Sequence, residues 1–528
     1  MDPSATASSW APLRARVFRA LWLAVLASNI GTWMQTVGAQ WLLVGRPGAA
    51  TLVSLVQTAT TLPIVLLALP AGVLADSLDR RRLLVAVQGF LALAGAVLAA
   101  LTAAGQMPPA LLLTLTFVLG CGAALTAPAW QAVVPDLVPR SQLHAASALG
   151  SLSVNLARAV GPALAGLLVA RVGPAAVFAL NALSFAVFGA TVALVGPRGT
   201  ATETPERFVA ALAAGVRYVR NAPVVRRILL RSIVFVVPAS VLWALLPLVA
   251  SELLGLGAGG FGLLLAAVGG GAVAGALLLP RLRARWSANR RLALAGLVGA
   301  AALVVTVSVP SFPVVLAALV PAGLAWLTVL TSLNAAMQLF LPVWVRARGL
   351  SFAQLVLFGG QAAGSLLWGL VAEAAGLTVA FLAAAALLLA GAATVRRAPL
   401  LDTRGMDRGP AAYWADPELA FEPDPDSGPV LVTVSYTVPP ERVEAFLAEM
   451  TRLGRSRRRT GASRWRLYRD GAATDRYVEA WLVPSWAEHL RQHEGRLTRT
   501  DQAIEEAATA LSTTEPVVLH LLPADPDG

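Results

Sequence analysis

Twelve apolar runs, each long enough to cross a lipid bilayer, constrain the fold of this chain more than any other feature. A spanning helix needs about 20 predominantly apolar residues. Because 57% of the 528 residues are hydrophobic and only 13% are charged, a soluble globular fold is excluded. The runs lie at 19–43, 51–75, 83–104, 109–134, 144–171, 174–195, 228–251, 259–280, 291–309, 312–336, 350–374 and 377–395. We therefore expect an all-α membrane protein with twelve transmembrane helices.

The basic residues, all arginines, collect in alternate connections between these runs. They occupy 14–19, 80–82, 140, 198–231, 281–291, 346–348 and 396–397, whereas only Arg46 and Arg171 fall in the other set of connections. Cytoplasmic loops carry the excess of arginine in membrane proteins. We expect a multi-pass protein of the cell inner (plasma) membrane with both termini in the cytoplasm. This distribution explains the basic pI without nucleic-acid binding, since the arginines lie at span ends.

An internal repeat relates the first six runs to the last six. Pairs of identical residues are separated by 203 positions at Gly72/Gly275, Arg80/Arg283, Gly161/Gly364, Gly166/Gly369 and Gly173/Gly376. One offset shared by several different loops indicates a duplicated unit. Transporters are often built from two such halves, with the substrate bound between them near the membrane midplane.

The domain organisation follows from these runs and from a change of composition after residue 397. A polar segment at the midpoint, 196–227, contains the amphipathic stretch FVAALAAGVRYVRN, which predicts a helix lying along the cytoplasmic interface. Residues 402–428 are rich in Asp, Glu, Pro and Gly and are typical of a linker. The expected parts are 1–18, a cytoplasmic segment; 19–195 and 228–396, the two six-helix halves; 196–227, the central loop; 397–428, the linker; and 429–522, a cytoplasmic α+β domain.

The C-terminal segment is expected to form the order βαββαβ with an extra helix. VLVTVSYTV from Val430 alternates with period two, and strand-like runs also begin at Ser463, Arg476 and Pro516. Helical spacing occurs at 443–453, 486–497 and 501–511. This order suits a small ferredoxin-like antiparallel sheet with helices on one face.

The loop between the second and third runs carries an unusual group of charged residues. Gly72 and Asp76 are followed by Arg80, Arg81 and Arg82. The pattern resembles the signature loop of the major facilitator superfamily, although Asp79 replaces the family's second glycine. The resemblance implies gating roles for these five residues, since in the family this loop stabilises one closed state. The alternative is that the arginines only set the topology.

Gly161, Pro162 and Gly166 in the fifth run resemble an exporter-type motif of the same superfamily, and the chain is most similar to its siderophore-exporter-like branch. The resemblance implies a secondary transporter that exports a small organic molecule, such as a drug, siderophore or secondary metabolite, by alternating access. The family's fourth helix often carries an arginine for proton coupling, and the fourth run here has none. Proton antiport is thus implied by the family alone.

Polar residues inside the runs are candidates for a substrate cavity, because such residues are costly in a membrane. The 203-residue offset maps Arg158 onto Gln361, at equivalent depths of the two halves. For the amides, ordinary hydrogen bonding between helices is the alternative. For Arg158 we favour a functional role, with an anionic substrate or a carboxylate as partner. The candidates are Asn29, Trp33, Gln40, Asn155, Arg158, Gln354 and Gln361.

Acidic residues near the runs are few, and Glu252 and Glu373 are the candidate proton carriers. The remaining expected partners of this part are the lipid bilayer and the small-molecule substrate. No cofactor and no catalytic residue are expected in it.

The C-terminal segment, with Trp486, His489 and His493, resembles the antibiotic biosynthesis monooxygenase-like domains, which form dimeric α+β barrels. The resemblance implies dimerisation. His489 and His493 lie one helical turn apart, and His520 lies on the last strand. Zinc needs three or four ligands and a single pair at this spacing is a weak signal, so solvated or packing histidines are favoured and no metal is expected. An alternative function is a membrane-tethered, cofactor-free oxygenase. Two complete repeat halves exceed what an anchor needs, so we expect a transporter rather than an enzyme.

Overall fold

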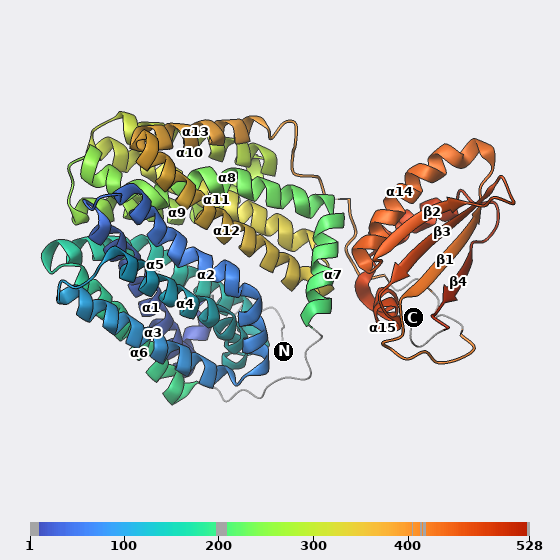
Figure 1. Ribbon diagram of the computed structural model, residues 1–528, viewed down its shortest axis with the longest axis horizontal. Coiled ribbons are helices and arrows are strands. Elements are labelled where there is room, and N and C mark those ends of the chain that lie inside the picture. Colours follow the sequence, from blue (N-terminus) through green and yellow to red (C-terminus); the bar gives the residue numbers. More distant parts are fainter. Residues whose placement is uncertain (1–9, 197–207, 404, 412–413, 415–418, 525–528) are drawn as a thin grey trace. The chain divides into compact units, whose positions relative to one another are not determined.

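The computed structural model describes residues 10–196, 208–403, 405–411, 414 and 419–524 of the chain. Within helices, the side chains of residues 68–69, 72–73, 75–77 and 208–213 also lie outside the description. The described residues fall into two compact units. One contains most of the long apolar helices, and the other contains the C-terminal α+β domain, the helix of the central loop up to residue 229, and residues 334–352. Figure 1 shows the helices and strands of both.

The first half of the membrane unit consists of six long helices. Proline at the first position of α4 and of α6 suits a helix start, because that position needs no N–H donor. The side chain of Asp79 accepts a hydrogen bond from the backbone N–H of Arg82 and so caps α3. The helices are α1 (Arg16–Leu43), α2 (Ala49–Ser77), α3 (Arg80–Ala103), α4 (Pro109–Leu137), α5 (Leu143–Arg171) and α6 (Pro174–Val195).

The second half repeats this arrangement with α8 to α13. A π-helical turn, η3 (Val249–Leu253), extends α8. Eleven described helices of the chain are long and apolar enough to cross a membrane, and α13 is a shorter apolar helix of 17 residues. The expected twelfth span therefore corresponds to a helix at the lower limit of spanning length. The helices are α8 (Pro223–Leu248), α9 (Ala258–Arg285), α10 (Ala288–Ser308), α11 (Phe312–Phe340), α12 (Val343–Ala375) and α13 (Leu377–Ala393).

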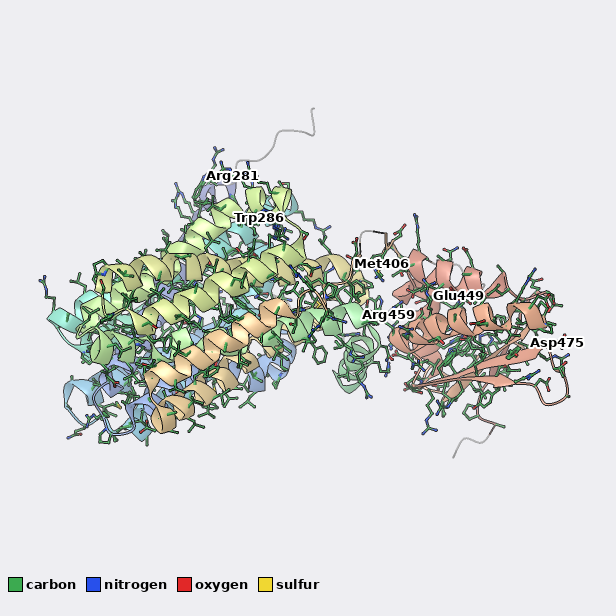
Figure 2. The ribbon with its side chains drawn as sticks, turned by 90° about the horizontal axis from the view of Figure 1, so that it is seen from above. Arg281, Trp286, Met406, Glu449, Arg459 and Asp475 are labelled. Atoms are coloured by element: carbon green, nitrogen blue, oxygen red, sulfur yellow. The ribbon has the colours of Figure 1, made fainter. Side chains whose placement is uncertain are left out.

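Large apolar side chains are exposed on these helices, among them Leu93, Leu194 and Leu277. A soluble protein rarely exposes so many, whereas a lipid-facing surface requires them. At the carboxyl end of α9, arginine and tryptophan side chains are present besides aliphatic ones. Arg281 and Trp286, labelled in Figure 2, lie at the carboxyl end of α9, as anchors at a membrane interface do.

Helix α7 (Phe208–Asn221) occupies the central loop where an amphipathic helix is expected. Within its compact unit α7 contacts α14 of the C-terminal domain. Tyr218 is buried against Trp344, with ring centroids 5.7 Å apart. Burial raises the pKa of Tyr218 to about 12. The phenol is therefore neutral at physiological pH.

The C-terminal domain contains one antiparallel sheet in the strand order β2-β3-β1-β4. Val430, Val432, Val434 and Tyr436 alternate along β1 and point into one buried core with Phe446 of α14. The period-two pattern of the sequence therefore corresponds to one buried sheet face. The strands are β1 (Val430–Thr437), β2 (Arg464–Arg469), β3 (Arg476–Val483) and β4 (Val517–Leu521), and the helices are α14 (Val443–Thr460), α15 (Trp486–Arg491), the π-turn η5 (Gln492–Arg496) and α16 (Arg499–Thr509).

A fully buried ion pair joins α14 to the sheet of this domain. Arg457 donates to Glu479 at 3.1 Å and to Glu505 at 2.9 Å, and its guanidinium lies 4.4 Å from the Trp481 ring centroid. Burial acts to lower the pKa of Arg457, but the two carboxylates outweigh it and raise that pKa well above its usual value. Arg457 is therefore a fixed cation in the core.

Part of the expected linker is bound to this domain. The backbone N–H groups of Arg499 and Thr500 donate to the carbonyls of Gly409 and Asp407. The indole of Trp414 donates to Glu505 at 3.0 Å. These contacts tie the segment that precedes β1 to α16 and to the domain core.

Candidate functional site

The two helical halves meet through closely packed glycines on α5 and α9. A Cβ atom placed on Gly166 would lie 2.7 Å from the carbonyl oxygen of Ala258 and 3.0 Å from the Cα of Gly262. A Cβ on Gly262 would lie 2.5 Å from the carbonyl oxygen of Pro162. Only small residues allow two membrane helices to approach this closely. Two residues of the exporter-type motif, Pro162 and Gly166, therefore lie where the halves touch.

An equivalent contact joins α12 of the second half to α2 of the first. A Cβ on Gly369 would lie 1.9 Å from the Oγ of Ser54 and 3.0 Å from the carbonyl oxygen of Ala50. Farther along the same pair of helices, Thr58 donates to the carbonyl of Ala362 at 3.0 Å. Two of the contacts between the halves are thus built around glycines of the 203-residue repeat.

Two further repeat pairs occupy matching places in the two halves. Gly161 packs α5 against α1 at Trp33, and Gly364 packs α12 against α8 at Val237. Gly173 and Gly376 precede α6 and α13 with φ values of 99° and 92°, which disfavour any residue with a side chain. The offset seen in the sequence therefore reflects equivalent positions in space.

A row of aromatic side chains crosses the interface of the halves. The rings of Trp33 on α1 and Trp243 on α8 have centroids 5.7 Å apart. The ring centroids of Trp243 and Trp326 are 5.6 Å apart, and those of Trp326 and Phe235 are 6.0 Å apart. Such rings supply a large apolar surface for an organic molecule.

Arg158 of α5 lies at the end of this row. Its guanidinium is 5.6 Å from the Trp33 ring centroid, a distance at which a cation is attracted to the ring face. Its Nε is buried and has no hydrogen-bond partner among the described residues. A Cβ on Gly269 of α9 would lie 2.8 Å from the carbonyl oxygen of Arg158. Arg158 is therefore a cation at the contact between the halves, and its Nε–H is available to donate a hydrogen bond.

The amide candidates divide into two groups. Asn29 donates to Ser153 of α5 at 3.1 Å, and Gln40 donates across the halves to the carbonyl of Trp243 at 2.8 Å. Asn155, by contrast, donates to the carbonyl of Ser151 on its own helix at 2.9 Å. These bonds are of the ordinary interhelical or local kind that the sequence left as an alternative.

The glutamines predicted on α12 differ in burial. Gln354 is exposed, whereas Gln361, the repeat partner of Arg158, is half-buried. The shared surface of α1, α5 and α8 contains four of the seven predicted residues: Asn29, Trp33, Gln40 and Arg158. The cavity role of all seven predicted residues stays a prediction.

The arginines of the loop between α2 and α3 contact the ends of neighbouring helices. Arg80 donates to the carbonyl of Ala132 at 3.2 Å and pairs with Asp136 of α4 at 3.6 Å. Arg81 donates to the carbonyl of Ala193 on α6, and the Arg82 side chain is exposed. Positive groups at helix carboxyl ends are favourable.

Two predicted members of this loop cannot be placed further. Gly72 and Asp76 belong to α2, and their side-chain positions lie outside the described residues. Their gating roles stay predictions.

The predicted proton carriers lie at helix ends. Glu252 is exposed on the π-turn η3, and Glu373 is exposed near the end of α12. π-Helical turns inside membrane helices are frequent at functional sites. The structure leaves the proton role of both residues untested.

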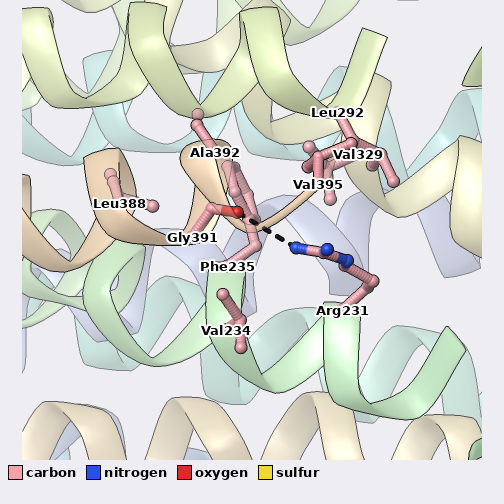
Figure 3. Close-up of a pocket in the computed structure, with 10 residues that line it drawn as sticks. Arg231, Val234, Phe235, Leu292, Val329, Leu388, Gly391, Ala392 and Val395 are labelled. Carbon is pink, nitrogen blue, oxygen red and sulfur yellow. Dashed lines mark hydrogen bonds between the residues drawn. The ribbon is translucent and has the colours of Figure 1, made fainter. Parts of the chain in front are cut away.

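Arg231 of α8 is a buried cation that sequence reasoning does not single out. It donates to the carbonyls of Gly391 at 3.0 Å and Thr394 at 2.6 Å, where α13 ends. Figure 3 shows Arg231 pointing to Gly391 beside a cavity of about 20 Å³. A cavity of this volume holds one or two water molecules, not a drug-sized ligand. Arg231 therefore caps the carboxyl end of α13. The sequence does not reveal this role, because Arg231 belongs to the 198–231 cluster of arginines that sets the topology.

A second missed feature is a buried amide pair. Asn181 of α6 donates to Gln35 of α1 at 2.5 Å, and both side chains are almost fully buried. In the sequence, each of these residues is only an isolated amide within an apolar run. That pattern does not indicate which helix carries its hydrogen-bond partner.

Comparison with known proteins identifies the family of this chain. A family model described as transmembrane secretion effector matches residues 7–526. The multidrug efflux pump Tap of Mycobacterium tuberculosis (strain ATCC 25618 / H37Rv) is 28% identical over 405 residues, covering 74% of this chain and 94% of that protein. The macrolide efflux protein A of Streptococcus pyogenes is 27% identical over 178 residues, covering 34% of this chain and 44% of that protein.

Solved structures agree on the fold. A bacterial homologue of the human lysosomal transporter Spinster, in an inward-facing and occupied conformation, superposes with a TM-score of 0.59 at 16% identity, over 73% of this chain and 97% of that one. An auto-inhibited peptide transporter of the POT family superposes with a TM-score of 0.60 at 12% identity, over 74% of this chain and 98% of that one. The family match decides between the two expected functions, because such proteins are transporters and not enzymes. This chain is a multi-pass membrane transporter of the major facilitator superfamily and belongs to its transmembrane secretion effector family.

Proposed function

We propose that this transporter exports small organic molecules by alternating access of its two helical halves. The observation that carries the proposal is the surface between the halves, where Gly166 and Gly369 pack against the opposite half and Arg158 lies against the Trp33 ring. Substrates of two-half transporters bind at such an interface. The names of the relatives, a multidrug efflux pump and a macrolide efflux protein, support export as the direction.

The side chains at this surface favour a substrate with an apolar ring system and an oxygen-rich or anionic group. Trp33, Trp243 and Trp326 offer ring faces, and Arg158 has an Nε donor that no described residue uses. Guanidinium groups bind carboxylates and carbonyl oxygens through fixed donor geometry. Substituted aromatic acids and macrolide-like compounds combine both properties.

The loop arginines support a cytoplasmic location of both termini. In this orientation the glycine contacts at Gly166 and Gly369 lie at the outer end of the bundle. Both belong to helix ends joined by the α5–α6, α8–α9, α1–α2 and α12–α13 connections. Tight contacts there correspond to a state closed to the outside.

Proton entry can drive export if an acidic group alternates between the two sides. Glu252 and Glu373 are the carriers we propose. Inverted membrane vesicles test both direction and coupling. With a fluorescent aromatic acid as probe, uptake is expected to rise when the vesicle interior is acidified, and flux that ignores the pH gradient contradicts antiport.

The C-terminal domain is, we further propose, a ferredoxin-like module that pairs with the same domain of a second copy. The strand order β2-β3-β1-β4 with antiparallel pairs supports this class. The helices cover one sheet face, while the other presents Leu431, Leu482, Leu519 and Leu521. Leu519 and Leu521 are about half exposed, at 53% and 49%.

Light scattering of the purified full chain tests this pairing. A dimer is expected, and replacing both Leu519 and Leu521 with glutamate is expected to give monomers because charges do not pack between apolar sheets. Leu447→Glu is the matched control, because Leu447 is a 43% exposed leucine on helix α14 and not on the open sheet face, and this variant is expected to stay dimeric. A wild-type monomer at micromolar concentration contradicts the proposal.

A further inference from the structure

Three of the four histidines of this chain meet in the C-terminal domain, although His520 lies on a different element from His489 and His493. His489 and His493 come from α15 and η5, and His520 comes from β4. Ligand nitrogens of all three lie within 4.8 Å of one another. His489 is fully buried, His493 is buried and His520 is half-buried.

The local folding of each element explains this meeting. Ser485 caps α15, since its side chain accepts a hydrogen bond from the backbone of Glu488. The π-turn η5 then continues the helix through His493. The β1–β4 register pairs His520 with Val432, whose side chain lies on the helix-covered face of the sheet. Opposed residues of an antiparallel pair share a face, so His520 is directed to the helix side.

The spacing of the imidazoles fits a tetrahedral metal site. The Nε2 atoms of His489 and His493 are 3.3 Å apart. Two nitrogens bound to zinc at about 2.0–2.1 Å with tetrahedral angles lie about 3.3–3.4 Å from each other. The ring centroids of His489 and His520 are 4.9 Å apart. A ring nitrogen of His520 lies within 4.8 Å of those of His489 and His493, and binding of a metal ion draws it closer.

The surroundings also match those of a metal-bound imidazole. The Nδ1 of His489 lies 3.4 Å from the side-chain oxygen of Gln492, whose Nε2 donates to Thr460 at 3.3 Å. Such a partner on the outer nitrogen orients the ring and leaves Nε2 for the metal.

A direct hydrogen bond between two histidines is the simpler explanation of the 3.3 Å contact. It accounts for His489 and His493 but gives no reason for His520 to lie at the same point. Two tryptophan rings lie against the three histidines. The ring centroids are 4.8 Å apart for Trp414 and His493, and 6.1 Å apart for Trp486 and His520. The ligand set is nitrogen only, which suits zinc, cobalt, nickel and copper and not calcium or magnesium.

We propose that His489, His493 and His520 bind one divalent transition-metal ion of the zinc class, with one coordination position left for water or another ligand. This goes beyond the transport function, since the site lies in the C-terminal domain and not among the membrane helices.

Metal titration of the purified full chain tests the site, with an affinity tag that contains no histidine and after removal of metal by a chelator. Cobalt is the spectroscopic probe, because tetrahedral Co²⁺ absorbs visible light strongly, and zinc is titrated by calorimetry. We expect one ion per chain. His520→Ala is expected to weaken binding more than tenfold, and Gln492→Ala about 10- to 100-fold through loss of ring orientation.

His144 provides the matched control, because it is the fourth histidine of the chain and is exposed at the start of α5. His144→Ala is expected to bind metal like the wild type. His520 is chosen for the main variant because it is half-buried on an edge strand, and hydrogen exchange of β1 checks that the sheet is intact. Zinc binding no tighter than about 1 mM in the wild type, or equal affinity of His520→Ala and wild type, overturns the proposal.

Discussion

Gly166 and Gly369 are related by the internal repeat and join the two halves of the transporter in equivalent ways. Because Gly166 has no side chain, the backbone of α9 packs directly against it, and the start of α2 packs against Gly369 in the same way. The two contacts lie at the ends of α5 and α12 that lead into the next helix. Alternating access requires that these contacts form and break, so their fit bears directly on transport.

Replacing Gly166 or Gly369 with alanine is expected to slow transport and to lower thermal stability. The added Cβ meets the carbonyl oxygen of Ala258 at 2.7 Å in the first case and Ser54 at 1.9 Å in the second. Overpacking of this kind typically costs about 1–3 kcal/mol. Vesicle transport and thermal unfolding in detergent measure the two effects.

Gly270 is the matched control for these variants. It lies in α9, and a Cβ placed there has open space around it. Gly270→Ala is expected to transport like the wild type. Full activity of both Gly166→Ala and Gly369→Ala would show that these contacts tolerate a methyl group and do not limit the cycle.

The repeat shows how far the sequence predicts this fold. A constant offset between glycines needs no structure to detect, and each half must place them at equivalent turns and contacts. The direction of Gln354 could not be predicted, because the neighbours of a helix face depend on packing. The same holds for His520, whose position beside His489 depends on the β1–β4 register. Long-range register is not encoded in local periodicity.

Arg158→Ala is expected to reduce transport of anionic aromatic substrates about tenfold or more while the protein stays folded. Loss of a hydrogen bond to a charged group costs about 1.5–3 kcal/mol, which corresponds to at least a tenfold change. Arg158→Lys keeps the charge but loses the planar donor set, so an intermediate rate is expected. Initial rates in vesicles measure the effect.

Arg171→Ala is the control for Arg158, since Arg171 is exposed at the last position of the same helix. It is expected to leave the rate unchanged. Normal transport by Arg158→Ala removes this residue from the substrate site.

Arg80 and Arg283 are repeat partners whose contacts differ, and their variants are expected to differ as well. Arg80 binds the carbonyl of Ala132 and pairs with Asp136, whereas Arg283 has a weaker contact of 3.5 Å with the carbonyl of Thr331. The Arg80–Asp136 pair contributes about 0–1 kcal/mol, enough to shift a balanced conformational equilibrium up to about fivefold.

Arg80→Ala is therefore expected to impair transport more than Arg283→Ala. Initial transport rates at matched expression compare the two, and Asp136→Asn is expected to reproduce part of the Arg80→Ala effect. Equal rates for both arginine variants contradict a greater gating role of Arg80 than of its repeat partner Arg283.

Glu488 is a charged centre that links α7 to the C-terminal domain within their compact unit. It accepts from Arg217 of α7 at 3.0 Å and from Arg496 at 2.8 Å. Burial raises the pKa of Glu488, but the bonds and charges of Arg496, Arg491 and Arg217 outweigh this and hold it below its usual value. Glu488 is therefore an anion throughout the physiological range.

Arg217→Ala is expected to loosen α7 from the domain without unfolding it, because Glu488 keeps Arg496 as a partner. Faster hydrogen exchange in α7 and α14, with unchanged exchange in β1 and β3, is the expected result. Arg491→Ala is the control, since Arg491 is more exposed and lies on the same helix as Glu488. Unchanged exchange in Arg217→Ala contradicts a docking role for this ion pair.

Asp501 gives the C-terminal domain a defined dependence on pH. It forms the capping box of α16 with Thr498, accepts from Ser456 and pairs with Arg459, which Figure 2 labels on α14. Burial raises the pKa of Asp501, but the charge of Arg459 and these hydrogen bonds outweigh it and lower the pKa from 3.8. Because the folded carboxyl binds its proton more weakly than the unfolded one, its stabilisation is fully present above pH about 4 and is lost as the pH falls through the lowered pKa.

Asp501→Asn is therefore expected to destabilise α16 by about 1.5–3 kcal/mol at pH 7, with a difference from wild type that shrinks as the pH falls below about 4. The ratio of hydrogen-exchange rates of variant and wild type at each pH measures this, since intrinsic exchange cancels in the ratio. Asp470→Asn is the control, because Asp470 pairs only with the exposed Arg476 among the described ion pairs and is expected to change stability by less than about 0.5 kcal/mol. A ratio for Asp501→Asn that stays constant from pH 7 to pH 3 would mean that the carboxylate charge does not stabilise α16, and that Thr498 and Ser456 hold its first turn through neutral hydrogen bonds alone.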